Sequence, residues 1–234
     1  MSPAGPAPAM SPRRRSRAWV GFFVALTLLA GAAVTLEVWY NVHQQLTPEA
    51  LAAARRLWQA KGPADYDLKY LVSLQSREGE RLTGRVHDGT LKNVTVNGEP
   101  LDPVLYAFHD LTPLLEQAAS AEGEREVSGA APEQARAVVE VQVRGGRAVG
   151  GSCNGWPLPR DGAGPYDMAG LFAGIARLVD QDEHAGAWRP YVVATFDKKD
   201  GHLVHFVHSR MRARERVEIQ VGEVTPPGQA PTSR

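Results

Sequence analysis

The residues whose types and spacing could do chemistry are three histidines at a spacing of three, His202, His205 and His208 in "GHLVHFVH". Neutral imidazole is a common ligand for zinc, copper and nickel, so a metal site is one hypothesis for this stretch. The stretch follows a glycine turn and is rich in Val, Leu and Phe, which predicts a strand. Along a strand, His202 and His208 share a face about 20 Å apart and His205 points away. We therefore expect exposed imidazoles rather than a metal site, and no cofactor.

Cys153 is the single cysteine of the chain, so no internal disulfide can form. A cysteine near a histidine is a candidate nucleophile, but this one aligns with Val96, an apolar strand position, which favours a small core residue. A disulfide to another chain is the third interpretation. The sequence contains no Gly-rich phosphate loop, Ser nucleophile elbow or His-Glu-x-x-His motif, and we assign no catalytic residue.

Trp156 is the strongest candidate for a binding contact. It follows an Asn-Gly turn and aligns with Glu99, a position that predicts exposure, and exposed tryptophans often anchor interfaces. The alternative is a tryptophan that covers its own hairpin. Tyr166, which aligns with His109, is a weaker candidate of the same kind. Two charged runs, residues 210–216 and 180–184, predict a solvated face and a loop at a helix end.

The first part of the chain predicts a membrane anchor. Residues 1–17 are basic and of low complexity, and residues 18–36 are an uncharged, almost wholly apolar run of the length that spans a bilayer. Aromatic residues stand near both ends, and the arginines before the run predict a cytoplasmic N-terminus. We expect a retained anchor over residues 18–40 and an exported main domain. The alternative is a signal peptide cleaved near "AGA" at residues 30–32.

The charge balance argues against nucleic acid as a partner. The chain has 26 basic and 26 acidic residues, and four of the basic ones lie in the first 17 residues. The rest of the chain is mildly acidic and offers no extended basic face. The expected partners are the membrane, through residues 18–40, and a protein of the cell envelope.

An internal repeat organises the folded domain, which we place at residues 46–222 with a disordered tail at 223–234. Units at about 82–120 and 139–177 align without a gap at an offset of 57. Each predicts a β-hairpin, a second turn at Asn-Gly, and a helix that begins behind an aspartate. The hairpin turns are Asp88-Gly89 and Gly145-Gly146, and the aspartates are Asp110 and Asp167.

The segments outside the repeat complete the expected fold. "TPEALAAARRLWQAKG" predicts a helix that Thr47 caps and Gly62 ends. Residues 66–74 predict a strand, residues 191–196 lead through the turn "DKKDG" into the histidine strand as a third hairpin, and the alternation at residues 216–221 predicts a last strand. The sequence therefore predicts an α+β domain: one antiparallel sheet built from duplicated hairpin–helix units, with helices on one face, preceded by one transmembrane helix.

Short motifs over about residues 55–221 resemble a bacterial exported family of unknown function that often occurs on lipoproteins. The family pattern is a Trp helix, a Tyr-rich strand, a V-x-D-G-x-V hairpin, a DLF helix and a hairpin whose turn reads D-x-x-x-G. The chain lacks the cysteine pair and the lipobox frequent in that family. The resemblance implies the fold and an exported location, and no activity. The matching residues are Trp58, Tyr66, Tyr70, Val86, Asp88, Gly89, Asp167, Phe172, Asp197 and Gly201.

These observations predict a membrane-anchored extracytoplasmic binding or structural module. The alternative is a hydrolytic or metal-dependent enzyme of the cell envelope. The two hypotheses make different demands on the structure. An enzyme needs a concave pocket with converging polar groups, whereas a docking module needs an exposed apolar patch around Trp156.

Overall fold

The computed structural model describes residues 19–20, 22–32, 45–75, 80–87, 90–109, 111–130, 134–158, 162–184, 190–210 and 215–227. The chain divides into two units, Met1–Gln44 and Gln45–Arg234. In the first unit, residues 19–20 and 22–32 are helical, and their large apolar side chains are more than half exposed. No helix in the described part of the chain is both long and apolar enough to cross a bilayer. The anchor over residues 18–40 stays a prediction.

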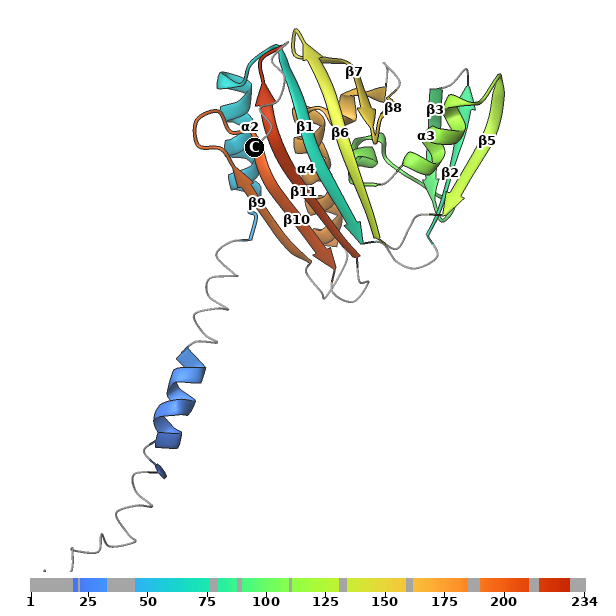
Figure 1. Ribbon diagram of the computed structural model, residues 1–234. Helices are drawn as coiled ribbons and strands as arrows, with labels where there is room; N and C mark the ends of the chain where they lie inside the picture. Colours follow the sequence, from blue (N-terminus) through green and yellow to red (C-terminus); the bar gives the residue numbers. More distant parts are fainter. Residues whose placement is uncertain are drawn as a thin grey trace, which may run out of the picture. The chain divides into compact units, whose positions relative to one another are not determined.

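The second unit is α+β and contains a seven-stranded sheet in the order β8-β7-β6-β1-β11-β10-β9 (Figure 1). All its neighbouring strands are antiparallel, which confirms the predicted sheet type. The bounds are β1 Tyr66–Gln75, β6 Gln134–Arg144, β7 Arg147–Cys153, β8 Trp156–Pro157, β9 Tyr191–Phe196, β10 Leu203–Arg210 and β11 Glu215–Thr225.

One face of this sheet is buried and the other is open, because side chains alternate along each strand. In β6, buried and exposed residues alternate along almost the whole strand. The exposed side chains of Lys69 and Glu140, on neighbouring strands, form an ion pair with 2.6 Å between Nζ and Oε1. Tyr70, Val139 and Ile219 on the opposite face are almost fully buried.

Two helices, α2 (Pro48–Lys61) and α4 (Met168–His184), pack on the buried face, as predicted. Thr47 caps α2, accepting from the Ala50 backbone N–H at 3.2 Å, and Asp167 caps α4, accepting from Gly170 N at 2.7 Å. The indole of Trp58 in α2 meets the Tyr66 ring edge-on, with 5.3 Å between ring centroids. The Tyr66 hydroxyl accepts from Met168 N, at 3.4 Å, so one β1 residue contacts both helices.

The first repeat unit does not join this sheet, which corrects the prediction of a single sheet. It forms a four-stranded sheet in the order β4-β3-β2-β5. The physical reason is that β1 already pairs with β6 on one edge and β11 on the other. A strand that the sequence analysis missed, Glu124–Ala130, pairs with the free edge of β2 instead. The elements are β2 Arg81–His87, β3 Thr90–Val96, β4 Glu99–Pro100, η1 Pro103–Phe108, α3 Thr112–Ala119 and β5 Glu124–Ala130.

The two repeat units make the same backbone interactions 57 residues apart. Asn97 and Asn154 both have positive φ, 53° and 50°, and the carboxamide oxygen of each accepts a backbone hydrogen bond at 2.8 Å. The donors are Arg81 N and Val138 N. The predicted turn at Gly145-Gly146 is present, with φ of 56° and 71°, whereas Asp88, Gly89 and Asp110 lie outside the described residues.

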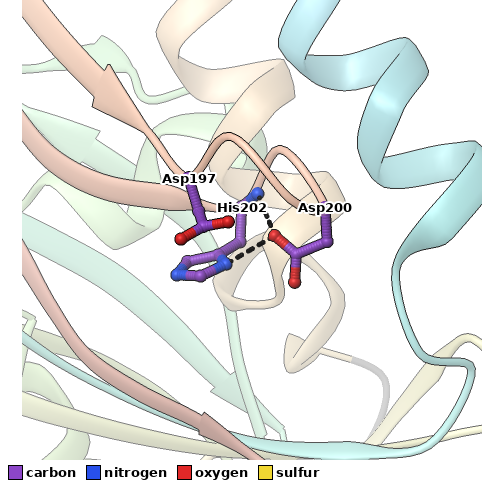
Figure 2. Close-up of side chains that lie close together, drawn as sticks. All are labelled: Asp197, Asp200 and His202. Carbon is purple, nitrogen blue, oxygen red and sulfur yellow. Dashed lines mark hydrogen bonds and ion pairs between the residues drawn. The ribbon is translucent and has the colours of Figure 1, made fainter.

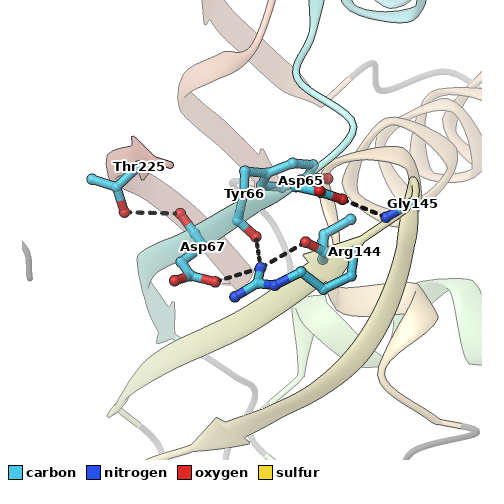
Figure 3. A network of polar contacts seen from close by, with 7 residues as sticks. Asp65, Tyr66, Asp67, Arg144, Gly145 and Thr225 are labelled. Carbon is cyan, nitrogen blue, oxygen red and sulfur yellow. Dashed lines mark hydrogen bonds and ion pairs between the residues drawn. The ribbon is translucent and has the colours of Figure 1, made fainter. Parts of the chain in front are cut away.

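Arg144 ties the start of β1 to the end of β6 (Figure 3). Its Nη1 donates to the carbonyls of Tyr66, at 3.1 Å, and Val143, at 2.7 Å. The same nitrogen lies 2.8 Å from Asp67 Oδ1 in an ion pair. Asp65 accepts from Gly145 N in the following turn. These contacts hold the β6–β7 hairpin against β1.

Candidate ligand-binding pocket

Each of the three histidines lies within hydrogen-bonding distance of a different carboxylate. His202 Nδ1 lies 2.7 Å from Asp200 Oδ1, His205 Nε2 lies 3.0 Å from Glu218 Oε1, and His208 Nε2 lies 2.8 Å from Asp182 Oδ2. Leu203–Arg210 is a strand, as predicted, and the strand separates the imidazoles. His208 is buried, at 4% exposure, where the sequence analysis expected an exposed imidazole.

His202 belongs to a tight turn that also contains Asp197 and Asp200 (Figure 2). One ligand-type atom from each of the three lies within 4.8 Å of the others, a spacing that a metal ion could bridge. The carboxylates also serve the turn itself. Asp197 accepts from Lys199 N at 2.6 Å, and Asp200 accepts from His202 N at 3.0 Å. The hydrogen bond from Lys199 N lowers the pKa of the Asp197 carboxyl. These contacts account for the cluster as a structural turn.

Trp156 and Tyr166, the predicted contact residues, both pack inward. Trp156 is half-buried in β8 and packs against the core, which fits the interpretation that it covers its own hairpin. Tyr166 is 4% exposed, and its carbonyl accepts from the Tyr70 hydroxyl at 3.2 Å. Burial removes Tyr166 from the set of exposed contacts. Cys153 is also buried, at 3% exposure, beside Thr112.

A pocket of about 490 Å³ opens where the two sheets and α4 meet. This size lies in the range of small-molecule sites in proteins. The apolar part of the lining (the floor) comes mainly from the first repeat unit, with further residues from β1, α4 and β11. The apolar lining includes Leu74, Leu82, Val96, Leu101, Leu105, Phe108, Leu178 and Val217. The polar lining includes Glu80, Glu99, Asp102, His109, Arg177, Gln181, His208, Arg210 and Glu215.

A buried ionic chain forms one wall of the pocket. Asp182 lies in α4 at 7% exposure and binds His208 on one carboxylate oxygen. Its other oxygen accepts from Arg210 Nη2 at 2.9 Å. Arg210 Nη1 reaches Glu215 Oε2 at 3.7 Å. Because Asp182 is held from two sides, the imidazole of His208 is fixed in orientation at the pocket wall.

This ionic chain corrects two expectations about charged runs. Residues 180–184 were expected in a loop, but they form the last turn of α4, where Asp182 faces β10. Arg210 was expected on a solvated face, but it is half-buried between two carboxylates. Residues 211–214 of the basic run lie outside the described residues.

Two lining groups have shifted pKa values. Burial lowers the pKa of His109 to about 4, so this imidazole is neutral at pH 7. Burial, and then the nearby charge of Glu215, raise the pKa of the Glu80 carboxyl. Shifted groups that face a cavity mark a candidate functional site. His109 comes directly after η1, where its backbone N–H donates to Tyr106 O at 3.2 Å.

The sequence predicted an exposed imidazole at His208 and a solvated run at Arg210, and it did not predict the pocket that both residues line. The lining comes from strands of both sheets, η1 and α4, whose order in the chain does not predict their meeting. One weak signal was present: His109 and Tyr166 stand at equivalent positions of the repeat, yet only His109 could carry charge. Comparison of the chain with protein-family models, curated proteins and solved structures finds no match. The resemblance to an exported bacterial family stays a prediction.

Proposed function

We propose that the chain is a membrane-anchored extracytoplasmic module that binds a small, largely apolar ligand in the pocket between its two sheets. The single observation that carries the proposal is the pocket itself. It combines apolar side chains with polar groups, some of which, such as His208, are fixed by ionic contacts, and its size fits a small molecule. The inward packing of Trp156 and Tyr166 also favours a ligand within the fold over docking at those side chains.

Photoaffinity labelling tests this proposal in membranes that contain the full chain. The probe is a ten-carbon alcohol with a diazirine on the alkyl chain and a terminal alkyne for recovery. We expect labelled peptides from η1 and α4, whose Phe108 and Leu178 line the floor. Peptide mapping separates this labelling from insertion into lipid or the N-terminal segment.

A pocket-filling variant supplies the decisive comparison. Leu178→Trp places a larger side chain into the pocket from a partly exposed helix position and should abolish labelling of η1. Val149→Trp, at a β7 position that is 45% exposed and outside the lining, should leave labelling unchanged. Equal labelling of the two variants, or none of the parent chain, would refute binding in this pocket.

The proposed anchor rests on the uncharged run after the arginines and on the exposure of its apolar side chains. It is tested by alkaline carbonate extraction of membranes followed by protease treatment. We expect the full-length chain to stay with the membrane. Release of a shortened chain that begins near residue 33 would support the cleaved signal peptide instead.

A hydrolytic enzyme remains the second candidate because of one observation, the His208–Asp182 pair. A carboxylate that orients an imidazole beside a cavity is the arrangement of a general base. The described lining contains no serine, threonine or cysteine, so the nucleophile would be water. Hydrolysis of short-chain aryl esters that His208→Gln abolishes, while probe labelling persists, would favour the enzyme.

We also propose that the two repeat units arose by duplication. The support is the gap-free offset of 57 residues together with equivalent hydrogen bonds at Asn97 and Asn154. In this account one unit stayed in the large sheet and the other formed a sheet of its own. Substitutions of Asn97 and Asn154 by alanine test whether the two units are equivalent.

A further inference from the structure

Acidic side chains outnumber basic ones among the described residues that line the pocket. The described lining contains four acidic side chains, Glu80, Glu99, Asp102 and Glu215, against two arginines, Arg177 and Arg210. His109 adds no positive charge at pH 7 because its pKa is about 4. Among the described residues, the lining therefore carries more negative than positive charge beside its apolar side chains.

Both arginines are already engaged by carboxylates. Arg177 lies 3.3 Å from Asp102 Oδ2 and 3.9 Å from Asp180 Oδ2. Arg210 lies 2.9 Å from Asp182 and 3.7 Å from Glu215. An anionic ligand would have to compete with these carboxylates for each guanidinium and would meet their repulsion.

Glu80 and Glu99 have no basic partner among the described residues. Glu80 stands directly before β2, partly buried, and close enough to Glu215 for the two charges to repel. A half-buried carboxylate next to a second carboxylate is unfavourable, and a bound cation would relieve this repulsion. Glu99 lies in β4 on the same lining.

We propose that the ligand is an amphipathic organic cation, whose apolar body lies on the floor and whose ammonium group lies between Glu80 and the neighbouring carboxylates. The inference rests on the proposed binding function and adds the chemical class of the ligand. A metal ion is the less suitable occupant, because the lining offers an apolar floor. In addition, the one metal-compatible cluster found among the described residues is the turn at Asp197.

The test compares three photoaffinity probes that share one ten-carbon alkyl group and differ only in the head group. The ten-carbon diazirine probe is prepared with a trimethylammonium, a hydroxyl or a carboxylate head and used on the full chain in membranes of neutral lipid. We expect half-maximal labelling of the η1 and α4 peptides at about tenfold lower concentration for the ammonium probe than for the hydroxyl probe. The carboxylate probe should label more weakly than either.

Two variants assign the preference to the carboxylates. Glu80→Gln should reduce the ammonium preference to about twofold, and the hydroxyl probe should label this variant like the parent chain. Glu126→Gln, which removes an exposed charge in β5 outside the lining, is the matched control and should change nothing. Because Glu80→Gln removes a repulsion, loss of folding is not the expected outcome.

The pH dependence supplies a further readout, since a trimethylammonium has no proton to lose. The preference should fall as the pH drops through the raised pKa of Glu80, earlier than for an ordinary carboxylate. Glu126→Gln should keep this fall and Glu80→Gln should lose it. The charged and titratable groups that line the pocket with Glu80 are Glu99, Asp102, His109, Arg177, His208, Arg210 and Glu215.

The outcomes separate the inference from the proposed function. Equal labelling by all three probes, or stronger labelling by the carboxylate, overturns the cationic ligand and leaves the pocket as a binding site. Displacement of the ammonium probe by calcium, without displacement of the hydroxyl probe, overturns it in favour of a metal ion. Absence of pocket labelling by every probe overturns both proposals.

Discussion

The neutral imidazole of His109 makes a specific prediction about stability and pH. His109 lines the pocket directly after η1, and burial lowers its pKa from 6.5 to about 4. As the pH falls, the unfolded chain takes up the proton first, near pH 6.5, while the folded chain resists until about pH 4. The folded state therefore loses stability across this window as the pH drops, and the full loss is present below about pH 4.

The size of the effect follows from the two pKa values. Each tenfold difference in proton affinity is worth about 1.4 kcal/mol, so the drop from 6.5 to about 4 corresponds to a loss of up to about 3 kcal/mol. In His109→Gln this part of the pH dependence is absent. Glutamine also changes the packing, but this contribution to the free energy of unfolding is the same at every pH. It cancels when the difference between the two proteins at pH 4.5 is compared with their difference at pH 7.

The assay is urea unfolding at several pH values, followed by tryptophan fluorescence. We expect the free energy of unfolding of the parent chain to fall more steeply than that of His109→Gln between pH 6.5 and 4.5. NMR titration of the His109 ring gives its pKa directly. Parallel pH profiles for the two proteins, or a measured pKa near 6.5, would refute the reasoning from burial.

Three further predictions concern the framework of the pocket. Asp182→Asn removes the charge that pairs with Arg210 and one of the two acceptor oxygens, and should lower the free energy of unfolding by about 1–3 kcal/mol, measured by urea unfolding. Gly174→Ala should lower the melting temperature and cost about 1–3 kcal/mol. Its Cβ would collide with the Phe108 ring and approach Val104 O to 2.9 Å. Asn154→Ala loses the side-chain hydrogen bonds to Val138 N, Thr112 Oγ1 and Arg136 O and leaves alanine at positive φ, which should cost about 2–3 kcal/mol by thermal unfolding.

Each of these predictions has a matched control. Glu140→Gln removes half of an exposed ion pair and should cost at most about 1 kcal/mol, so a loss equal to that of Asp182→Asn would contradict the argument from burial. Gly150→Ala meets open space and should change stability by less than about 0.5 kcal/mol. Asn97→Ala loses the hydrogen bond equivalent to that from Val138 N, also at positive φ, and should cost about 1 kcal/mol; no cost at all would argue against equivalent repeat units.

Local signals in the sequence were sufficient for most elements. Thr47 predicted the start of α2 because a hydroxyl before a proline satisfies the free N–H groups of a first turn. Glycine at residues 145 and 146 predicted the tight turn of the second hairpin because both positions need positive φ. Alternation predicted the strand that contains residues 216–221, and the turn "DKKDG" predicted the hairpin that begins at Tyr191. In each case the cause lies within a few residues of the element.

Local signals failed where one segment depends on another far away. The strand Glu124–Ala130 has only one buried residue, Val127, so its sequence lacks the apolar alternation of a core strand. It forms because the free edge of β2 lies beside it. The last turn of α4 reads as an acidic loop. This turn is helical in the structure, where Asp182 contacts His208 and Arg210 of β10, a strand that follows later in the chain.

The sequence by itself determined the antiparallel α+β class, the strand at the three histidines, the caps and tight turns, and the repeated pattern at an offset of 57. Tertiary structure alone decided that β1 pairs on both edges, that the first repeat unit therefore builds a second sheet, and that a pocket lies between the sheets. The physical reason is the range of the interactions. Caps, turns and alternation act over a few residues, whereas the partners of Asp182 and the neighbours of Glu80 are set by contacts between distant segments.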